Sequence, residues 1–393
     1  MTARSFLRLA AAICAVPCFA GCAGLQTGTA EPAGIANVGP LYPGISAYIV
    51  VDANDGRVLL ASQADQKRSV ASLTKIATTV VVLDFIRNSQ GSLDEIMTVP
   101  ASVAALGVPS PLGFQPGDGV SVRDALYACM MGSDNFAAET LGVHFGAKLS
   151  QAGLGGAPMQ AFISQMNGLR SKYGMKNTKF ENPHGLDLPG ASGYSCASDI
   201  ARLMNRALIT PGFTFYSSQK ERRLTYLRGG APRSITVRNT NELVGRFRID
   251  AGKTGTTQLA GPCLAVTAPK PATVVKRNDG STLVIPHRLT VVVLGAPDRF
   301  GATSKLLADG WNRYEAWRAA GSPGGNPGEY LGAAPSANPA PSPAPAPAPP
   351  AYSPPPAYSP PPAYAPPPGY SSPPAYAPPP NFYPPGGYQP MPY

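Results

Sequence analysis

The sequence is poor in histidine and cysteine, and both shortages exclude classes of site. Its 393 residues include three histidines and six cysteines. The histidines are scattered and no Cys/His spacing typical of a metal site occurs, so we expect no metal. Beyond Cys22 only Cys129, Cys196 and Cys263 remain, so at most one disulfide can form, which excludes a disulfide framework. Cys129 stands in an apolar context and is expected in the core.

Long apolar runs and basic runs with interleaved aromatics are also missing. The apolar run from Leu9 to Ala20 is too short to span a bilayer, and no other stretch is long enough. Because Arg4 and Arg8 precede it, we interpret residues 1–21 as a secretory signal peptide and expect an exported, periplasmic or envelope protein. The net charge of +10 suits an anionic wall and lipid headgroups. Without such a basic run, nucleic acid is not expected as a partner.

The end of the signal peptide resembles a lipoprotein cleavage box. The stretch Phe19-Ala20-Gly21-Cys22 would make Cys22 the lipidated first residue, although such boxes usually carry Leu in the place of Phe19. Ordinary cleavage near Ala20 or Ala23 is the alternative. We favour lipidation of Cys22, which would anchor the protein to a membrane without spanning it. Residues 22–42 are rich in Gly, Ala and Pro and are interpreted as a linker.

The C-terminal segment, residues 321–393, differs abruptly in composition. Most of the 46 prolines lie there, and residues 351–380 repeat with a period of six. Such a segment cannot bury a core and is expected to be extended, with its tyrosines along one face of a polyproline II helix. We interpret it as a spacer; a surface that adheres to wall polymer or to a partner is the alternative.

Between linker and tail, the first structural pattern is a hairpin that leads into a helix. Two short apolar runs, 46–52 and 57–61, flank an Asp55-Gly56 turn, which is a strong hairpin pattern. The stretch 69–77 follows. The β-branched run 78–82 favours a strand by propensity, but we predict a helix because the spacing of Ser72 and Lys75 requires one.

Further elements are expected along the remaining chain. Residues 100–119 and 176–189 read as loops, and Ser121 is a plausible helix N-cap. We predict helices over 120–131, 136–145, 162–172, 199–208 and 304–317, and strands over 235–239, 245–252, 261–268 and 283–294.

Ser72 and Lys75 form the pattern S-x-x-K at the start of a predicted helix. Residues three apart lie on one helix face, so the serine hydroxyl and the lysine amine can meet. A serine needs an adjacent base to become a nucleophile. Lysine can be that base only if burial or neighbouring charge lowers its pKa. The apolar residues that follow would keep Lys75 away from bulk water, although S-x-x-K alone also fits an ordinary helix start.

Two more motifs follow in an order that a single domain can accommodate. Residues 133–135 read Ser-Asp-Asn and residues 253–255 read Lys-Thr-Gly. S-x-x-K, S-D-N and K-T-G together are the motif set of the penicillin-recognising acyl-serine enzymes. Three independent matches favour a catalytic function over a chance occurrence.

The pattern resembles the D-alanyl-D-alanine carboxypeptidases, the low-molecular-mass penicillin-binding proteins. The segments 182–186 (Asn-Pro-His-Gly-Leu), 198–201 and 260–264 also resemble that family. The resemblance implies an α/β (α+β) fold of the β-lactamase/transpeptidase type, with an antiparallel sheet flanked by helices and a helical subdomain. It places a catalytic domain at 43–320, with the site in the cleft between sheet and helical subdomain and with no cofactor.

The resemblance also implies a role for each motif residue. Ser72 would attack the carbonyl between the last two D-alanines, Lys75 would take its proton, and Ser133 would relay a proton to the leaving amine. Asn135 would bind the substrate's peptide carbonyl and help to hold Lys75. The backbone N–H groups of Ser72 and Thr256 would form the oxyanion hole.

The K-T-G motif would bind the other end of the substrate. Lys253 would bring positive charge to the terminal carboxylate, Thr254 would donate to it, and Gly255 would permit close approach of the backbone. The resemblance implies a penicillin-sensitive hydrolase, a serine protease that acts on peptidoglycan stem peptides. Such an enzyme would take part in peptidoglycan biosynthesis and cell wall biogenesis and would influence cell shape. A β-lactam would acylate Ser72 and leave slowly.

Several departures keep alternatives open. Asp134 replaces the more usual Gly, and S-D-N is also found in class A β-lactamases. No Glu-x-x-Leu-Asn motif accompanies Glu181, so we place the carboxypeptidase first. Cys196 stands where Thr is expected, and the proline-rich tail replaces the family's usual β domain. A Ser72–His184–Asp187 triad would need a different hydrolase class, and His184 is expected to be a loop residue bonded to backbone.

Two further functions are carried as alternatives. One is endopeptidase activity on cross-links, and the other is a non-catalytic, wall-binding lipoprotein with a dead enzyme domain. The dead-enzyme alternative is disfavoured because the motif residues are intact, namely Ser72, Lys75, Asn135 and Lys253.

Overall fold

The structure, a computed structural model, describes residues 34–190, 192–324 and 329–332. They belong to one compact unit, Met1–Pro339; a second unit, Ala340–Tyr393, lies outside the described residues. The predicted signal peptide, Cys22 and the tail beyond Gly332 lie outside them too. No helix in the described part of the chain is long and apolar enough to span a membrane.

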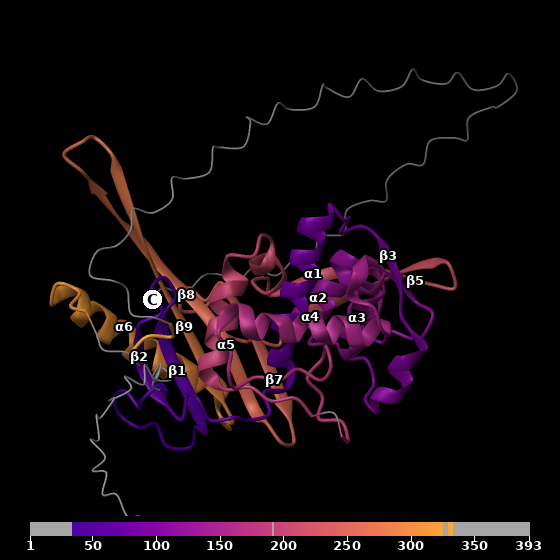
Figure 1. The fold of residues 1–393 in the computed structure, drawn as a ribbon, viewed down its shortest axis with the longest axis horizontal. Helices are drawn as coiled ribbons and strands as arrows, with labels where there is room; N and C mark the ends of the chain where they lie inside the picture. The colour runs from indigo at the N-terminus through magenta and orange to yellow at the C-terminus, as the bar shows by residue number, and fades with distance from the viewer. Residues whose placement is uncertain (1–33, 191, 325–328, 333–393) are drawn as a thin grey trace, which may run out of the picture. The chain divides into compact units, whose positions relative to one another are not determined.

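A five-stranded antiparallel sheet forms one side of the domain (Figure 1). Its strand order is β2-β1-β9-β8-β7. The N-terminal part of the domain therefore pairs with its C-terminal part through β1 and β9, which are far apart in the sequence. The strands are β1 (Ala47–Asp52), β2 (Val58–Ser62), β7 (Ala251–Thr257), β8 (Gly261–Lys276) and β9 (Thr282–Leu294).

The predicted N-terminal hairpin is confirmed as β1 and β2. In its turn Asp52 Oδ1 accepts from the backbone N–H of Asn54 at 3.0 Å, and Gly56 has a φ of 80° that favours glycine. Every residue of β1 is buried, since helices cover both faces of the sheet. Side chains alternate between the two faces along a strand, so Ile49 and Val50 enter different cores.

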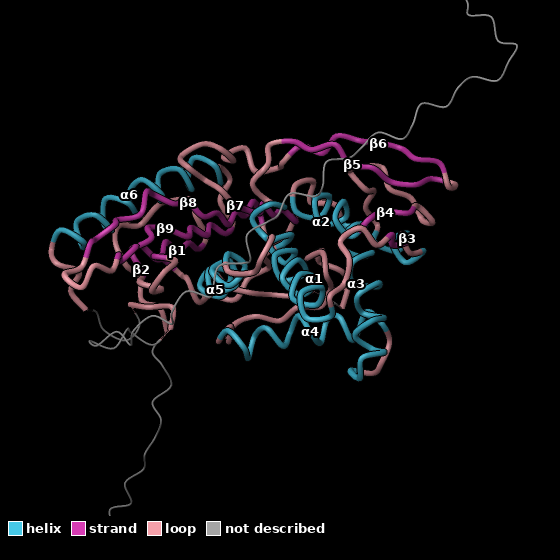
Figure 2. Tube along the Cα trace, turned by 90° about the horizontal axis from the view of Figure 1, so that it is seen from above, coloured by secondary structure: helices cyan, strands magenta, loops and turns pink. Residues whose placement is uncertain are grey.

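In the described ranges, six α-helices cover the sheet and build the helical subdomain (Figure 2). Helix α6 packs on one face of the sheet with Tyr48 and Val293, and α5 lies on the other. The α-helices are α1 (Lys75–Ser89), α2 (Val122–Met130), α3 (Asn135–Leu149), α4 (Pro158–Tyr173), α5 (Ala197–Leu208) and α6 (Arg299–Ala319).

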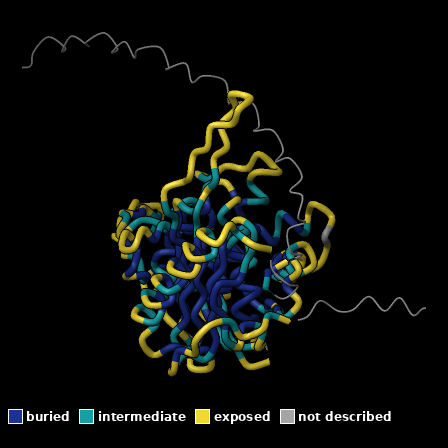
Figure 3. The backbone as a smooth tube through the Cα atoms, turned by 90° about the vertical axis from the view of Figure 1, so that its left-hand side faces the viewer, coloured by how far each residue is buried: buried dark blue, intermediate teal, exposed yellow. Residues whose placement is uncertain are grey.

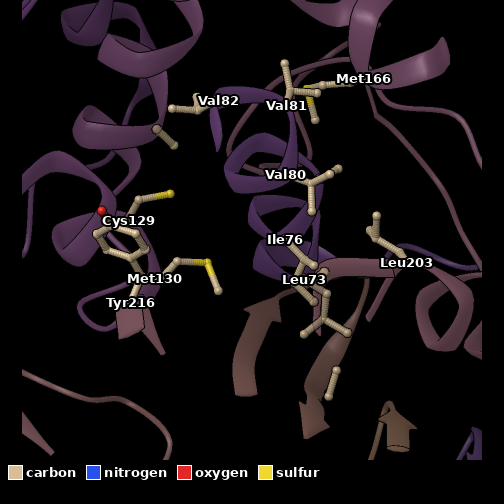
Figure 4. Close-up of a cluster of buried hydrophobic side chains, with 14 of the residues drawn as sticks. Leu73, Ile76, Val80, Val81, Val82, Cys129, Met130, Met166, Leu203 and Tyr216 are labelled. Carbon is tan, nitrogen blue, oxygen red and sulfur yellow. The ribbon is translucent and has the colours of Figure 1, made fainter. Parts of the chain in front are cut away.

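Helix α1 runs through the core, as predicted against its β-branched composition. Its first nine residues, 75–83, are all buried, and Figure 4 shows Ile76 and Val80 among side chains from other elements. Tertiary packing therefore overrides the strand propensity of residues 78–82. Every face of this part of the helix is buried, so each apolar side chain that fits contributes hydrophobic free energy whatever its propensity.

A second, four-stranded sheet in the order β3-β4-β5-β6 was only partly predicted. Residue 120 belongs to a strand, and the helix predicted from there begins two residues later, capped by Ser121, whose side chain accepts from Asp124 N at 3.0 Å. The loop expected over 100–119 contains a short 3₁₀ helix, Ala101–Leu106. The strands are β3 (Ile96–Thr98), β4 (Gly119–Ser121), β5 (Glu221–Arg228) and β6 (Ala231–Arg238).

The strand predicted over 245–252 is wrong, because that segment is mostly a turn. Gly245, Phe247 and Arg248 have φ values of 77°, 51° and 59°, which a strand does not accommodate. The strand instead begins at Ala251 and contains the whole Lys-Thr-Gly motif. The other helices and strands predicted from the sequence are present, most of them longer than expected.

Two structured segments flank the predicted domain limits of 43 and 320. Before the first limit, Val38 exchanges backbone hydrogen bonds with Ala61. After the second, Leu331 N donates to Gly56 O at 2.9 Å. At the far end of the sheet, the outer parts of β8 and β9 continue as an exposed two-stranded arm (Figure 3).

Candidate active site

Ser72 lies in a 3₁₀ turn, Ala71–Thr74, that leads directly into α1. Lys75, the first residue of α1, donates from Nζ to Ser72 Oγ at 2.9 Å. The two groups therefore meet as the three-residue spacing predicts. Ala71 has a φ of 48°, a left-handed conformation that costs a non-glycine residue about 1–2 kcal/mol. Such strain beside Ser72 indicates that the surrounding structure fixes the turn.

Lys75 is fully buried and is held by neutral acceptors. Its Nζ also donates to Asn135 Oδ1 at 2.7 Å and to the backbone oxygen of His184 at 2.9 Å. No ion pair of Lys75 is present among the described residues. Burial lowers the pKa of Lys75 to about 8, because the ammonium loses hydration that neutral acceptors replace only in part. A neutral amine is therefore accessible at moderate pH.

The Ser-Asp-Asn motif forms the turn between α2 and α3. Asp134 caps α3 by accepting from Ala137 N at 2.9 Å, and it also accepts from Ser110 Oγ. Ser133, with a φ of 56°, projects from this turn, and Asn135 is the first residue of α3. The buried carboxylate of Asp134 thus stabilises the turn through these hydrogen bonds and does not accept one from Lys75.

Strand β7 brings the Lys-Thr-Gly motif against the nucleophile turn. A Cβ on Gly255 would lie 3.1 Å from Ser72 N and 2.9 Å from Val70 O, so a side chain here would displace one of the two segments. Lys253 Nζ donates to Ser133 Oγ at 2.8 Å and to Thr254 O at 2.9 Å. Burial and the charge of Lys75 lower the pKa of Lys253.

Thr254 and Thr256 of this strand have local hydrogen-bond partners, and one partner of Thr256 is a residue that sequence analysis missed. The hydroxyls of Thr254 and Thr240 lie 2.6 Å apart, while Thr256 donates to Gly255 O at 2.8 Å. Arg299, at the start of α6, donates to Thr256 Oγ1 at 2.7 Å and to Gly255 O at 3.1 Å. No motif in the sequence marks Arg299 as a second cation beside β7.

Comparison with known proteins decides the family. A family model described as D-alanyl-D-alanine carboxypeptidase matches residues 43–276. The chain belongs to this family.

The chain matches only part of the length of its curated relatives. D-alanyl-D-alanine carboxypeptidase DacC of Escherichia coli is 33% identical over 279 residues, which are 68% of this chain and 62% of the relative. A D-alanyl-D-alanine endopeptidase of Pseudomonas aeruginosa is 33% identical over 222 residues, 56% of this chain and 65% of the relative. The match thus covers less than two thirds of these curated relatives.

Solved structures support the predicted fold class. The DD-transpeptidase of Streptomyces K15 matches with a TM-score of 0.58 and 26% identity, over 70% of this chain and 100% of that one. Ampicillin-bound penicillin-binding protein D2 of Listeria monocytogenes matches with a TM-score of 0.53 and 27% identity, over 70% and 99%. The β-lactamase/transpeptidase-like fold is therefore confirmed.

His184 contributes its backbone rather than a triad. Its Nδ1 accepts from Leu186 N at 3.1 Å, and its Nε2 lies 3.8 Å from Glu139 Oε2. Asp187 Oδ1 accepts from Ser69 Oγ at 2.8 Å. These contacts form no Ser72–His184–Asp187 relay, as expected. For His184, sequence reasoning missed that its carbonyl holds Lys75.

The remaining polar candidates are structural. Cys129, Cys196 and Cys263 are buried free thiols, and burial raises the pKa of the Cys129 thiol to about 11. Among the described residues, no group of three or more His, Cys, Asp or Glu side chains could hold a metal ion.

Replacing Gly185 with alanine is expected to slow acylation of Ser72 about tenfold or more. The new Cβ would lie 2.0 Å from Ala71 O, so the loop must move and His184 O must leave Lys75. Gly190→Ala is the matched control, because its φ is also positive at 72° but nothing lies within 4 Å of the added Cβ. Stopped-flow acylation by a fluorescent penicillin measures both variants; equal rates would contradict the steric argument.

Proposed function

We propose that this chain is a serine-type D-Ala-D-Ala carboxypeptidase that removes the terminal D-alanine from peptidoglycan stem peptides. The observation that carries the proposal is the bond from buried Lys75 to Ser72, with the ammonium of Lys253 across the site on Ser133. The first pair supplies an activated nucleophile. The second places a cation where a terminal carboxylate would bind.

In the first half-reaction Ser72 Oγ attacks the carbonyl between the two D-alanines while neutral Lys75 takes the hydroxyl proton. The backbone N–H groups of Ser72 and Thr256 stabilise the oxyanion; one such donor contributes about 2.7–4 kcal/mol in a related acyl transfer. The C–N bond then breaks, and the leaving amine receives a proton through Ser133. The products are free D-alanine and an ester on Ser72.

In the second half-reaction water hydrolyses the ester. Lys75, with its proton passed on, accepts a proton from the water, and the Ser72 hydroxyl is restored as the leaving group. A β-lactam carries an amide carbonyl and a carboxylate in the same relation as the substrate, so it would acylate Ser72 and leave slowly. Related proteins with ampicillin and cefotaxime bound support this extension.

Lys253, Thr254, Gly255 and Thr256 form the proposed substrate-binding side of the cleft. The hydroxyl of Thr254 either accepts from or donates to Thr240. In the first case its own proton is free for the substrate carboxylate. Arg299 adds positive charge beside Thr256.

The rate of acylation is expected to rise with pH. Burial lowers the pKa of Lys75 to about 8, so the neutral base is a minor form below that pH and the rate should rise up to about tenfold per pH unit there. Burial also lowers the pKa of Lys253. Lys253 binds the carboxylate as an ammonium, so its deprotonation opposes the rise at the upper end of the range. Penicillin acylation measured from about pH 6 to pH 9 tests this; a flat profile would contradict a buried lysine base.

Endopeptidase activity is the second candidate function, because two relatives carry that name. A β-lactamase is less well supported, since Glu181 is paired with Lys179 and no glutamate of the required motif is present. Release of free D-alanine from a pentapeptide stem, followed enzymatically, tests the proposal. Rapid turnover of nitrocefin without D-alanine release would favour the β-lactamase, and cleavage of cross-linked dimers alone would favour the endopeptidase.

We further propose an envelope setting built from the sequence segments. Residues 1–21 act as a signal peptide, Cys22 carries a lipid anchor, 22–42 form a linker, 43–320 form the catalytic domain and 321–393 a Pro/Tyr-rich spacer. The protein would then work in the periplasm or at the membrane surface, facing its peptidoglycan substrate. Loss of membrane association on Cys22→Ala, with unchanged activity, would support the anchor.

A further inference from the structure

A recess opens beside the nucleophile turn, at Ser69, three residues before Ser72. Its lining includes Lys67, Arg68 and Leu259. We propose that this recess is a subsite for a carboxylate on the acyl side of the scissile bond, in the side chain of the third stem residue. The proposal rests on the proposed function and specifies which stem peptides that site prefers.

The two cations in the recess have no acidic partner among the described residues. Arg68 donates from one guanidinium nitrogen to Gln66 Oε1 at 2.8 Å, and Lys67 Nζ lies 5.2 Å from the ring centroid of Tyr194. Both contacts are with neutral groups. By contrast, Arg228, Arg288 and Lys270 elsewhere on the surface are paired with carboxylates. The positive charge of the recess is therefore available to an anionic ligand.

The carboxylate of Asp187 also lines the recess, but its two oxygens are bonded or buried. Asp187 Oδ1 accepts from Ser69 Oγ at 2.8 Å, and its Oδ2 is buried without a hydrogen-bond partner. Neither oxygen of Asp187 is therefore free to pair with Lys67 or Arg68, which line the same recess. The net charge that a ligand encounters there remains positive.

The direction of β7 places the recess on the acyl side. The strand runs from Lys253, where the terminal carboxylate would bind, to Thr257, past the N–H of Thr256 at the scissile carbonyl. The turn that follows carries Leu259, which is 71% exposed and lines the recess. A peptide lying along β7 therefore sends the residues before its two D-alanines toward Leu259, Lys67 and Arg68.

Two carboxylates of a stem peptide could reach this position. One is on the side chain of the third residue when that residue is a diaminodicarboxylic acid; a lysine there has none. The other is the α-carboxylate of D-glutamate, one residue further from the scissile bond. We assign the third residue, because it directly precedes the D-alanine pair and Leu259 can pack against its methylene chain.

The test compares kcat/KM for D-alanine release from three pentapeptides. They carry diaminopimelate with D-glutamate, lysine with D-glutamate, and diaminopimelate with D-isoglutamine. We expect about tenfold or greater preference for both diaminopimelate peptides over the lysine peptide. In the double variant Lys67→Ala/Arg68→Ala that preference should fall to about one, with the lysine peptide unaffected. The backbone bonds of Arg68 to Ser195 are retained by alanine.

Lys276→Ala/Arg277→Ala is the matched control. It removes an adjacent, exposed Lys-Arg pair of equal charge, Lys276 at the end of β8 and Arg277 directly after it, and should leave all three rates unchanged. Equal rates for diaminopimelate and lysine peptides in the unmutated protein would overturn the subsite. Dependence on D-glutamate rather than on the third residue would overturn its assignment.

The proposed function is checked separately with diacetyl-lysyl-D-Ala-D-Ala and with penicillin acylation. Both substrates lack a carboxylate on the acyl side, so the double variant should process them like the unmutated protein. If the unmutated protein cleaves no peptide and is not acylated, the proposed function itself fails. If it cleaves them without preference, only the subsite fails.

Discussion

Replacing Lys75 with alanine is expected to slow acylation of Ser72 by about 10²- to 10⁴-fold, the range typical of a positioned general base. The substitution removes the amine 2.9 Å from Ser72 Oγ, and no other basic side chain contacts that hydroxyl among the described residues. The hydroxyl then has to lose its proton to water during attack. Stopped-flow acylation with a fluorescent penicillin measures the loss.

A structural explanation must be separated from a catalytic one, because Lys75 is buried. Alanine would leave Asn135 Oδ1 and His184 O without their donor and open a cavity. Lys75→Met fills most of the volume without supplying a base. If both variants melt near the temperature of the unmutated protein and both lose acylation, the base is the cause. A methionine variant that acylates normally would exclude Lys75 as the base.

Replacing Lys253 with alanine is expected to lower kcat/KM for a stem peptide by about 10²- to 10³-fold. A buried ammonium–carboxylate contact is worth about 2–5 kcal/mol on truncation, and each 1.4 kcal/mol is tenfold. Lys253 is 1% exposed and reaches Ser133 at 2.8 Å, so its loss also frees Ser133. Kinetics of D-alanine release measure the combined effect.

The carboxylate contribution is isolated with a substrate that lacks the charge. A peptide ending in D-alaninamide cannot use the ammonium, so Lys253→Ala should reduce its cleavage far less than that of the free acid. Lys270→Ala, which removes a surface lysine paired with Glu315, should change neither rate. An equal loss with acid and amide would assign Lys253 to Ser133 alone.

The motif residues could be predicted because their chemistry depends on short spacings. Ser72 and Lys75 are three residues apart, so a single helical turn brings them together. Placing Lys253 opposite them required a long-range pairing that no local pattern encodes. The resemblance to a known family supplied that pairing, and the hydrogen bond between Lys253 and Ser133 agrees with it.

Three features of the site escaped prediction: the carbonyl that holds Lys75, the position of Arg299 and the start of β7. The carbonyl of His184 that holds Lys75 could have belonged to any residue type at that place. Arg299 was missed because its neighbours Gly255 and Thr256 become adjacent only when α6 packs on the sheet. Strand β7 was placed too early, since the left-handed residues Phe247 and Arg248 leave no compositional trace.

Secondary structure followed packing more than propensity in two places. The β-branched run of α1 is helical because its surroundings bury it on all sides. Strand β5, missed in the sequence, is mostly polar and buries only Leu224, and its register is fixed by pairing with β6. Local composition carries little information about strands whose stability depends on a neighbouring strand.

Peptide mapping after incubation with a labelled penicillin tests the central claim most directly. The account predicts one label, an ester on Ser72, absent from Ser72→Ala and much slower to form in Lys75→Ala. A label on another residue, or no label on a folded protein, would contradict the assignment of Ser72 as the nucleophile.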